Sequence, residues 1–181
     1  MVLLSNRQKN IKPMLSQHSM RHKNSTKPSF YTPAPQFYLC EHCQRLTIDV
    51  AANRTSQRLD CCGRTMKHLL AQTPDGAHHL TLTIRGGFES NSLSVTVGQP
   101  AHPMTLQHHI AWMYLYTFQG GQLKFMVPGE ESTAMFALAD KDAYVYCDRA
   151  VCKGRDCKFN CKRGFCVWVY CNQYGLWHYS L

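Results

Sequence analysis

The chain has 181 residues and a formal net charge of +9, a length that suits one ordinary domain or a small domain joined to a medium one. It contains no apolar run of 18 residues, so the sequence predicts no membrane-spanning helix and no membrane partner. Residues 1–36 hold six Lys or Arg and no acidic residue, and residues 147–171 hold six basic and two acidic residues. Because the rest of the chain is close to neutral, the folded body has no basic face, and we expect no nucleic acid partner.

The first 36 residues lack a sustained hydrophobic period and are rich in Ser, Asn, Lys, Gln and Pro. This composition predicts a disordered basic extension over residues 1–36, with an organelle transit peptide as the alternative. The apolar stretch at its start, residues 1–4, is too short for a secretory signal. The ten cysteines of the chain therefore favour metal ligation over disulfides, and we expect a cytoplasmic location.

The first predicted folded unit holds two pairs of cysteines. Two residues separate Cys40 from Cys43, which lets a tight loop aim both sulfurs at one point, and the adjacent Cys61 and Cys62 come later. Neighbouring residues on a regular strand point in opposite directions, so the backbone must turn at the second pair, where Gly63 favours a turn. Four thiolates at this spacing predict a tetrahedral site for one iron or zinc ion, with disulfides or a zinc ribbon as the alternatives.

Residues 73–181, which follow this four-Cys domain of residues 37–72, have the pattern of a β-sheet protein. A Pro-Asp-Gly turn at residues 74–76 lies in the linker between the two parts. Short alternating segments then recur between turns, at residues 80–84, 93–97, 110–118, 123–127, 134–138, 143–147 and 167–170. About seven short strands at this spacing predict a mainly β fold of the immunoglobulin-like sandwich type.

Three histidines, His102, His108 and His109, fall within eight residues in the middle of this region. Pro103 disfavours a helix there, so we expect a loop that leads into a strand. In that strand residues 110, 112, 114 and 116 are expected on one face and residues 113 and 115 on the other. An imidazole-rich loop on a rigid sheet predicts a metal site, with surface histidines as the alternative.

These motifs occur in the order in which they occur in a known family. The chain resembles the desulfoferrodoxin family of superoxide reductases over roughly residues 37–146 and 167–178. The matching motifs are Cys40-Glu41-His42-Cys43, Asp60-Cys61-Cys62-Gly63, His102-Pro103-Met104, His108-His109-Ile110-Ala111-Trp112 and Cys171-Asn172.

The resemblance implies two iron sites. An iron in a small desulforedoxin-like domain is expected to be bound by Cys40, Cys43, Cys61 and Cys62, and the likeness favours iron over zinc there. A second, catalytic iron is expected to be bound by His79, His102, His108 and Cys171. In the family four histidines surround this iron in a plane, an axial cysteine lies beneath it, and the open position admits superoxide. The family reduces superoxide to hydrogen peroxide, a reaction that needs an external electron donor. The resemblance therefore suggests superoxide as the substrate, a rubredoxin-like donor and a homodimer.

Two departures from the family pattern concern the second iron. The family sequence is Cys-Asn-x-His-Gly, whereas Tyr174 stands at the histidine position here. A phenolate at this position would bind iron(III) and stabilise the oxidised state, and His78 and His178 are the candidates for the missing ligand. The family also has Glu-Lys before the first histidine, where Lys attracts superoxide and Glu caps the resting iron. Ala77-His78 takes the place of that pair.

An insertion at about residues 148–166 has no counterpart in the family. It lies in a run of cysteines at positions 147, 152, 157, 161, 166 and 171. Their spacing allows an additional iron–sulfur cluster, and a reduced or disulfide-linked loop is the alternative.

The leading hypothesis from the sequence is therefore a superoxide reductase. The alternative is a non-catalytic iron-binding electron-transfer protein in which Tyr174 has degraded the second iron site. A third hypothesis is a redox sensor or interaction module that works through the cysteine-rich insertion and the basic extension.

Overall fold

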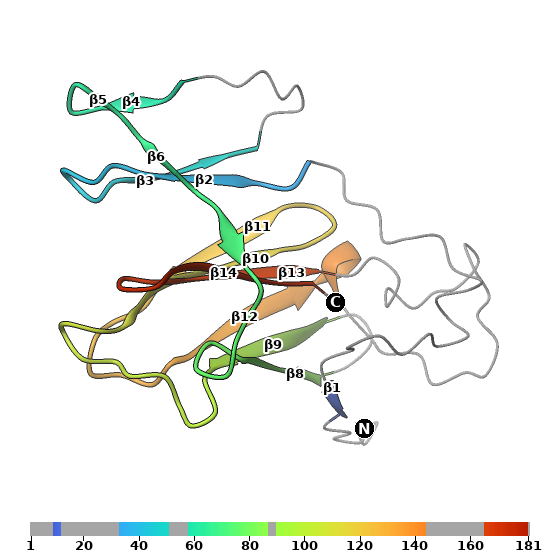
Figure 1. Cartoon of the computed structure of the whole chain (residues 1–181). Coiled ribbons are helices and arrows are strands. Elements are labelled where there is room, and N and C mark those ends of the chain that lie inside the picture. The colour runs from blue at the N-terminus through green and yellow to red at the C-terminus, as the bar shows by residue number, and fades with distance from the viewer. Residues whose placement is uncertain (1–8, 12–32, 51–57, 87–89, 144–164, 181) are drawn as a thin grey trace.

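The computed structural model describes residues 9–11, 33–50, 58–86, 90–143 and 165–180 (Figure 1). Within these ranges the chain forms strands and one short 3-10 helix, which confirms the predicted mainly β fold, and no helix is long and apolar enough to span a membrane. The elements are β1 (Lys9–Ile11), β2 (Gln36–Leu39), β3 (Leu46–Asp49), β4 (Asp60–Cys61), β5 (Arg64–Thr65), β6 (Lys67–Leu69), β7 (Ala71–Gln72), β8 (Leu80–Gly86), β9 (Ser90–Val97), β10 (Ile110–Tyr116), β11 (Gly121–Phe125), β12 (Thr133–Ala139), η1 (Asp140–Asp142), β13 (Cys166–Cys171) and β14 (Gly175–Ser180).

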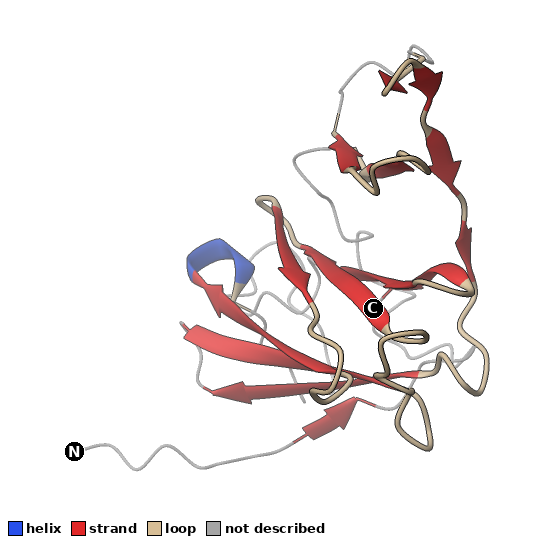
Figure 2. Cartoon of the chain, turned by 90° about the vertical axis from the view of Figure 1, so that its left-hand side faces the viewer, coloured by secondary structure: helices blue, strands red, loops and turns tan. Residues whose placement is uncertain are grey.

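Two sheets form the predicted sandwich (Figure 2). One is antiparallel, in the order β1-β8-β9-β12, and the other has the order β11-β10-β13-β14-β7. In the second sheet β7 runs parallel to β14, with Ala71 opposite Leu176. β1 lies in the extension that was expected to be disordered, yet it pairs with β8 through Asn10 and Thr83. The expectation of disorder is therefore wrong for these three residues.

Aliphatic side chains fill the space between the two sheets. The period-2 alternation that predicted the strands places alternate residues inside, so that β12 alternates buried and exposed positions. This core includes Leu82, Val95, Met113, Phe136 and Val169, all of them buried. The strands that pack around this core end at the loops that carry His102 and His108.

Over β10 and β13 the outer face of the five-stranded sheet is also buried, because the four-Cys unit (β2 to β6) packs against it. Phe37 on β2 is 1 % exposed, and its ring centre lies 5.2 Å from that of Trp112 and 5.5 Å from that of Trp168. Leu39 and Leu69 of the same unit join this second cluster. Strand β10 is therefore buried on both faces, and the two units of the chain share one aromatic interface.

Ile110 departs from the predicted alternation. The sequence placed it on the face of Trp112, but it packs between the sheets with Met113. The cause is a register shift in β10: Ile110 lies opposite Cys171, and Trp112 lies opposite Tyr170. A bulge of this kind inserts one residue and reverses the face of what precedes it.

The strand predicted at residues 143–147 is absent at Ala143, the one described residue of that segment. The other four residues lie outside the described part of the chain, as do residues 148–164 of the insertion. The predicted additional iron–sulfur cluster therefore falls mostly on residues that the structure does not describe, and it stays a prediction.

Candidate metal centres

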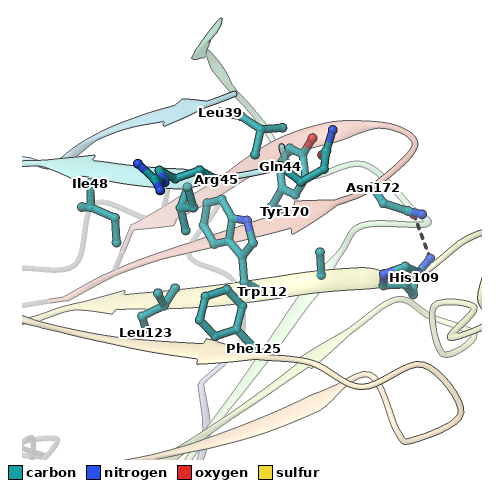
Figure 3. A pocket seen from close by; sticks show the side chains of 12 residues that line it. Leu39, Gln44, Arg45, Ile48, His109, Trp112, Leu123, Phe125, Tyr170 and Asn172 are labelled. Atoms are coloured by element: carbon teal, nitrogen blue, oxygen red, sulfur yellow. Dashed lines mark hydrogen bonds between the residues drawn. The ribbon is translucent and has the colours of Figure 1, made fainter. Parts of the chain in front are cut away.

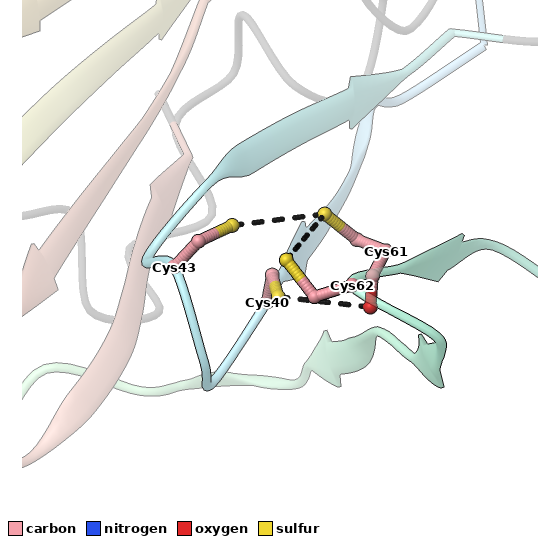
Figure 4. Close-up of side chains that lie close together, drawn as sticks. All are labelled: Cys40, Cys43, Cys61 and Cys62. Carbon is pink, nitrogen blue, oxygen red and sulfur yellow. Dashed lines mark hydrogen bonds between the residues drawn. The ribbon is translucent and has the colours of Figure 1, made fainter.

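The four cysteines of the first unit converge on one point (Figure 4). Their sulfur atoms all lie within 4.8 Å of one another, and all four are free thiols. Cys61 Sγ is 3.7 Å from Cys43 Sγ and 3.8 Å from Cys62 Sγ. A tetrahedron with metal–sulfur bonds of about 2.3 Å has edges of about 3.8 Å, so the cluster has the size of one tetrahedral metal site. We refer to it as the four-Cys centre.

A backbone turn allows the adjacent cysteines to face the same point. Strands β4 and β5 form a hairpin whose turn is made by Cys62 and Gly63, with φ angles of 52° and 72°. This left-handed conformation is the one that glycine adopts without cost, and it confirms the predicted turn. On the other side of the centre, the backbone N–H of Gln44 donates to the Cys40 carbonyl at 2.8 Å and closes the first loop.

The thiols of the four-Cys centre influence one another's ionisation. The backbone N–H of Cys43 is the main cause that lowers the pKa of Cys40 to about 6. The side chains of Cys43 and Cys61 raise the pKa of Cys62 to about 12. The Cys40 thiolate therefore forms readily, whereas the hydrogen bonds with the Cys43 and Cys61 side chains favour the neutral thiol of Cys62. Four thiolates need a cation among them, which fits a metal site.

A second group of ligand atoms lies at one end of the sandwich. One nitrogen of His78, one nitrogen of His102 and Cys171 Sγ lie within 4.8 Å of one another, and all three residues are buried. His78 precedes β8, His102 lies in the loop between β9 and β10, and Cys171 ends β13. Segments far apart in the sequence thus bring nitrogen and thiol donors to one place.

Hydrogen bonds determine which nitrogen of each imidazole is available. His78 Nδ1 donates to Asp75 Oδ1 at 2.9 Å, and His102 Nδ1 donates to the Pro103 carbonyl oxygen at 2.7 Å. Both tautomers leave a lone pair on Nε2. The Nε2 atoms of His78, His102 and His108 are buried and have no hydrogen-bond partner among the described residues. Because buried polar atoms rarely stay unpaired, these three nitrogens fit the ligands of a metal ion.

Burial supports the same assignment for His102. Desolvation is the main cause that lowers its pKa, which favours the neutral imidazole that a metal binds. The Cys171 side chain is fully buried next to it. We refer to His78, His102, His108 and Cys171 as the His/Cys centre.

The rings of the three histidines and of Tyr174 are arranged in a circle, each in contact with the next. The ring centre of His102 lies 5.1 Å from that of His78 and 4.6 Å from that of His108. The ring centre of Tyr174 lies 5.3 Å from that of His108 and 5.4 Å from that of His78. Three corners of the arrangement are therefore histidines, and Tyr174 takes the fourth.

Asn172 joins the histidine loop to the Cys171 turn. The backbone N–H of His109 donates to Asn172 Oδ1 at 2.9 Å, and the backbone N–H of Asn172 donates to the His109 carbonyl at 3.1 Å. Asn172 Nδ2 also donates to the Gln107 carbonyl at 2.9 Å. These bonds hold the residues on either side of His108 to Asn172, and so they position His108 relative to Cys171. The asparagine of the Cys-Asn motif therefore has a structural role.

Gly98 positions the other end of the histidine loop. Its φ is +88°, and a Cβ built there would lie 2.5 Å from the backbone nitrogen of His102. The backbone N–H of His102 donates to the Val97 carbonyl at 2.9 Å. A residue with a side chain at position 98 would displace the loop that carries His102.

The structure groups the predicted His102 and Cys171 with His78 in place of His79, and it places the predicted His108 beside them, with its ring centre 4.6 Å from that of His102. The His79 side chain is only partly buried and is not among the grouped ligand atoms. His78 is 3 % exposed and stacks on Trp177, with ring centres 4.1 Å apart and planes 11° apart. The sequence signal for His78 was Asp75, which lies three residues earlier and accepts hydrogen bonds from both the Nδ1 and the backbone N–H of His78.

His178 does not supply the missing fourth histidine. Its ring stacks on Trp168 at 4.6 Å, in the aromatic cluster beneath the four-Cys unit. His109 also points away from the centre, and its Nδ1 donates to the Thr105 carbonyl at 3.1 Å.

A cavity of about 630 Å³ lies between the four-Cys unit and the outer face of the five-stranded sheet (Figure 3). Its walls are mainly apolar and aromatic, and they include Leu39, Ile48, Trp112 and Phe125. The polar groups at one end, His109 and Asn172, are hydrogen-bonded to each other. The cavity is therefore a gap between the two units beside the His/Cys centre.

A β-sandwich with a buried His/thiolate cluster and an attached four-thiolate cluster defines a metalloprotein with two centres. The Desulfoferrodoxin family model matches residues 83–180. The chain is 35 % identical over 115 residues to the desulfoferrodoxin of Nitratidesulfovibrio vulgaris strain Hildenborough. This match covers 62 % of this chain and 89 % of the relative. It is also 34 % identical over 121 residues to a desulfoferrodoxin homolog of Archaeoglobus fulgidus. That match covers 65 % of this chain and 93 % of the relative.

The fold agrees with a solved structure. The crystal structure of the superoxide reductase from Treponema pallidum matches with a TM-score of 0.59 at 22 % identity, over 81 % of this chain and 98 % of that one. The chain therefore belongs to the desulfoferrodoxin family. Its four-Cys and His/Cys centres fit the two iron sites of a two-iron desulfoferrodoxin.

Proposed function

We propose that this protein is a superoxide reductase, with the His/Cys centre as its reaction site and the four-Cys centre as its second iron site. One observation carries the proposal: the buried Cys171 thiol lies with the partnerless Nε2 atoms of buried histidines in a chain of the desulfoferrodoxin family. Iron bound there would supply one electron to superoxide, and two protons would complete hydrogen peroxide.

The residues of the chain have distinct roles in this proposal. Asp75 and the Pro103 carbonyl hold the Nδ1 protons of His78 and His102, so that the Nε2 lone pairs of both would be free to bind a metal. Cys171 would bind as a thiolate, and its complete burial keeps solvent from competing for it. An external donor must return the electron after each turnover, and a rubredoxin-like protein fits that role. The homodimer and the cytoplasmic location stay predictions.

The described residues that build the site offer little electrostatic attraction for superoxide. With His78 as the first histidine ligand, the positions of the family's Glu-Lys pair hold Gly76 and Ala77. The three segments that build the site, residues 75–79, 102–109 and 171–175, contain no Lys or Arg. We therefore expect slower capture of the anion than a site with a nearby lysine would give.

Two observations favour a second candidate, a non-catalytic electron-transfer protein: Tyr174 at the fourth corner and the missing Glu-Lys pair. In that case the four-Cys centre would carry the function, and the His/Cys centre would bind iron without reacting with superoxide. The two candidates differ in one measurable property, which is whether the reduced protein consumes superoxide.

The test uses full-length protein that is loaded with iron and reduced without oxygen. A pulse of superoxide should disappear with one hydrogen peroxide formed per superoxide and no oxygen released. His78→Ala should abolish this reaction, whereas the matched variant His79→Ala should retain it. An iron-loaded protein that leaves superoxide to its spontaneous decay would instead support the electron-transfer candidate.

A further inference from the structure

Tyr174 lies in the turn between β13 and β14, at the rim of the His/Cys centre. Gln72 Nε2 donates to its carbonyl at 2.8 Å, and Gly175 after it has a φ of +88°. The side chain is 55 % exposed, and its hydroxyl has no hydrogen-bond partner in the described part of the chain. The backbone of this residue is thus held in place while its phenol oxygen stays available.

We propose that Tyr174 supplies a further ligand of the metal at the His/Cys centre, beside its three histidines and Cys171, through its phenolate oxygen. The inference rests on the proposed function, because it assumes that iron binds at this centre. It makes the centre a site of three imidazoles, one phenolate and one thiolate, a donor set that differs from the four imidazoles and one thiolate of the family pattern.

The distances between the rings carry this inference. An imidazole bound through Nε2 at about 2.1 Å has its ring centre about 3.2 Å from the metal, so two of them at a right angle have ring centres about 4.6 Å apart. The ring centres of His102 and His108 are 4.6 Å apart, and those of His78 and His102 are 5.1 Å apart. The His78–His102 and His102–His108 pairs therefore have about the ring spacing of neighbouring ligands around one ion, although His108 lies outside the group of ligand atoms within 4.8 Å of one another.

A phenolate ligand predicts a longer separation. With a metal–oxygen bond of about 2.0 Å, the ring centre of a tyrosine lies about 4.3 Å from the metal, and about 5.4 Å from the ring centre of a histidine at a right angle to it. The ring centre of Tyr174 lies 5.3 Å from that of His108 and 5.4 Å from that of His78. Both distances agree with an oxygen ligand that reaches the same ion from the fourth corner.

The donor chemistry has a consequence for the redox balance of the centre. Phenolate oxygen is an anionic ligand that iron accepts in other proteins, and its phenol proton leaves to solvent when the metal binds. A second anion beside the Cys171 thiolate stabilises iron(III) more than iron(II). We therefore expect a lower reduction potential than with histidine at position 174, and a need for a stronger reductant to restore the reduced state.

Resonance Raman and visible absorption of the oxidised, iron-loaded full-length protein test the inference. The wild type should show phenolate vibrations together with the thiolate-to-iron band of Cys171. Tyr174→Phe should lose the phenolate vibrations and keep the thiolate band. Tyr174→His should also lose them and should raise the reduction potential. Tyr170→Phe is the matched control, because Tyr170 stacks on Trp112 at 5.3 Å on the outer face of the sheet, and it should leave the spectrum unchanged.

Two results would overturn the inference. One is a wild-type spectrum with the Cys171 band but without phenolate vibrations, and the other is a Tyr174→Phe spectrum identical to that of the wild type. Either would leave the proposed function standing, because the thiolate band would still show iron at the His/Cys centre. A wild type without the thiolate band would refute the proposed function and this inference together.

Discussion

Replacing Asp75 with Asn is expected to weaken metal binding at the His/Cys centre about tenfold. Asp75 Oδ1 accepts two hydrogen bonds from His78, one from Nδ1 at 2.9 Å and one from the backbone N–H at 3.0 Å. Asparagine has the same shape and its oxygen can accept both bonds. The substitution therefore removes the negative charge and leaves the geometry in place.

The size of this loss of affinity follows from the strength of the charged hydrogen bond and from the exposure of the carboxylate. A hydrogen bond to a charged group is stronger than a neutral one by about 1–1.5 kcal/mol, which corresponds to roughly a tenfold change in affinity. The Asp75 side chain is 59 % exposed, so water screens its charge and keeps the effect near this value. Asp75→Ala also removes both acceptors and frees the His78 ring to rotate, so its loss of affinity should approach about 100-fold.

The assay is a titration of iron(II) against a chromophoric chelator, with occupancy read from the Cys171 thiolate band after oxidation. Asp60→Asn is the control, because Asp60 pairs with Arg58 at 3.1 Å beside the four-Cys centre and should not affect the other site. Unchanged affinity in both Asp75 variants would refute the assignment of His78 as a ligand oriented by this carboxylate.

Two further predictions concern stability. Phe37→Ala should lower the free energy of unfolding by about 3–5 kcal/mol, as measured by urea denaturation followed by tryptophan fluorescence. All three tryptophans belong to the sandwich, so an unshifted fluorescence transition in Phe37→Ala would show that the two units unfold independently. The control Phe37→Leu should lower the free energy of unfolding much less. Burial lowers the pKa of His178 below its usual 6.5, so the unfolded state binds more protons below that pH and stability falls as the pH falls through this region. His178→Phe should therefore lose less stability between pH 7 and pH 5 than the wild type, and equal losses would contradict the assignment.

The four-Cys centre and the sandwich could be predicted from the sequence because their signals are local. Two residues between Cys40 and Cys43 already determine that both thiols can meet, and the turn after Cys61-Cys62 follows from the rule that adjacent strand residues diverge. The alternating segments gave the strands of the sandwich in the same way. The meeting of the two cysteine pairs, which lie 18 residues apart, followed instead from their ligand count and from the resemblance to the family.

The choice between His78 and His79 depends on contacts that no local pattern contains. Both precede β8, and adjacent residues there face opposite directions, so a shift of one residue exchanges the two. What selects His78 is its stacking on Trp177, from the last strand, together with the hydrogen bond to Asp75. The bulge at residues 110–112 escaped prediction for a similar reason, because it is defined by the pairing of β10 with β13.

The departure from the family pattern falls on the part of the centre that is easiest to change. Hydrogen bonds within the protein orient His78 and His102, and Asn172 ties the His108 loop to the Cys171 turn. Tyr174 is more exposed than any of these residues, and the hydrogen bond from Gln72 holds its backbone while its ring contacts those of His78 and His108. A substitution at this corner can therefore alter the charge around the metal while the rest of the centre keeps its shape. In the proposed donor set the phenolate adds one negative charge where the family pattern has a neutral imidazole, so we expect position 174 to shift the balance between iron(II) and iron(III).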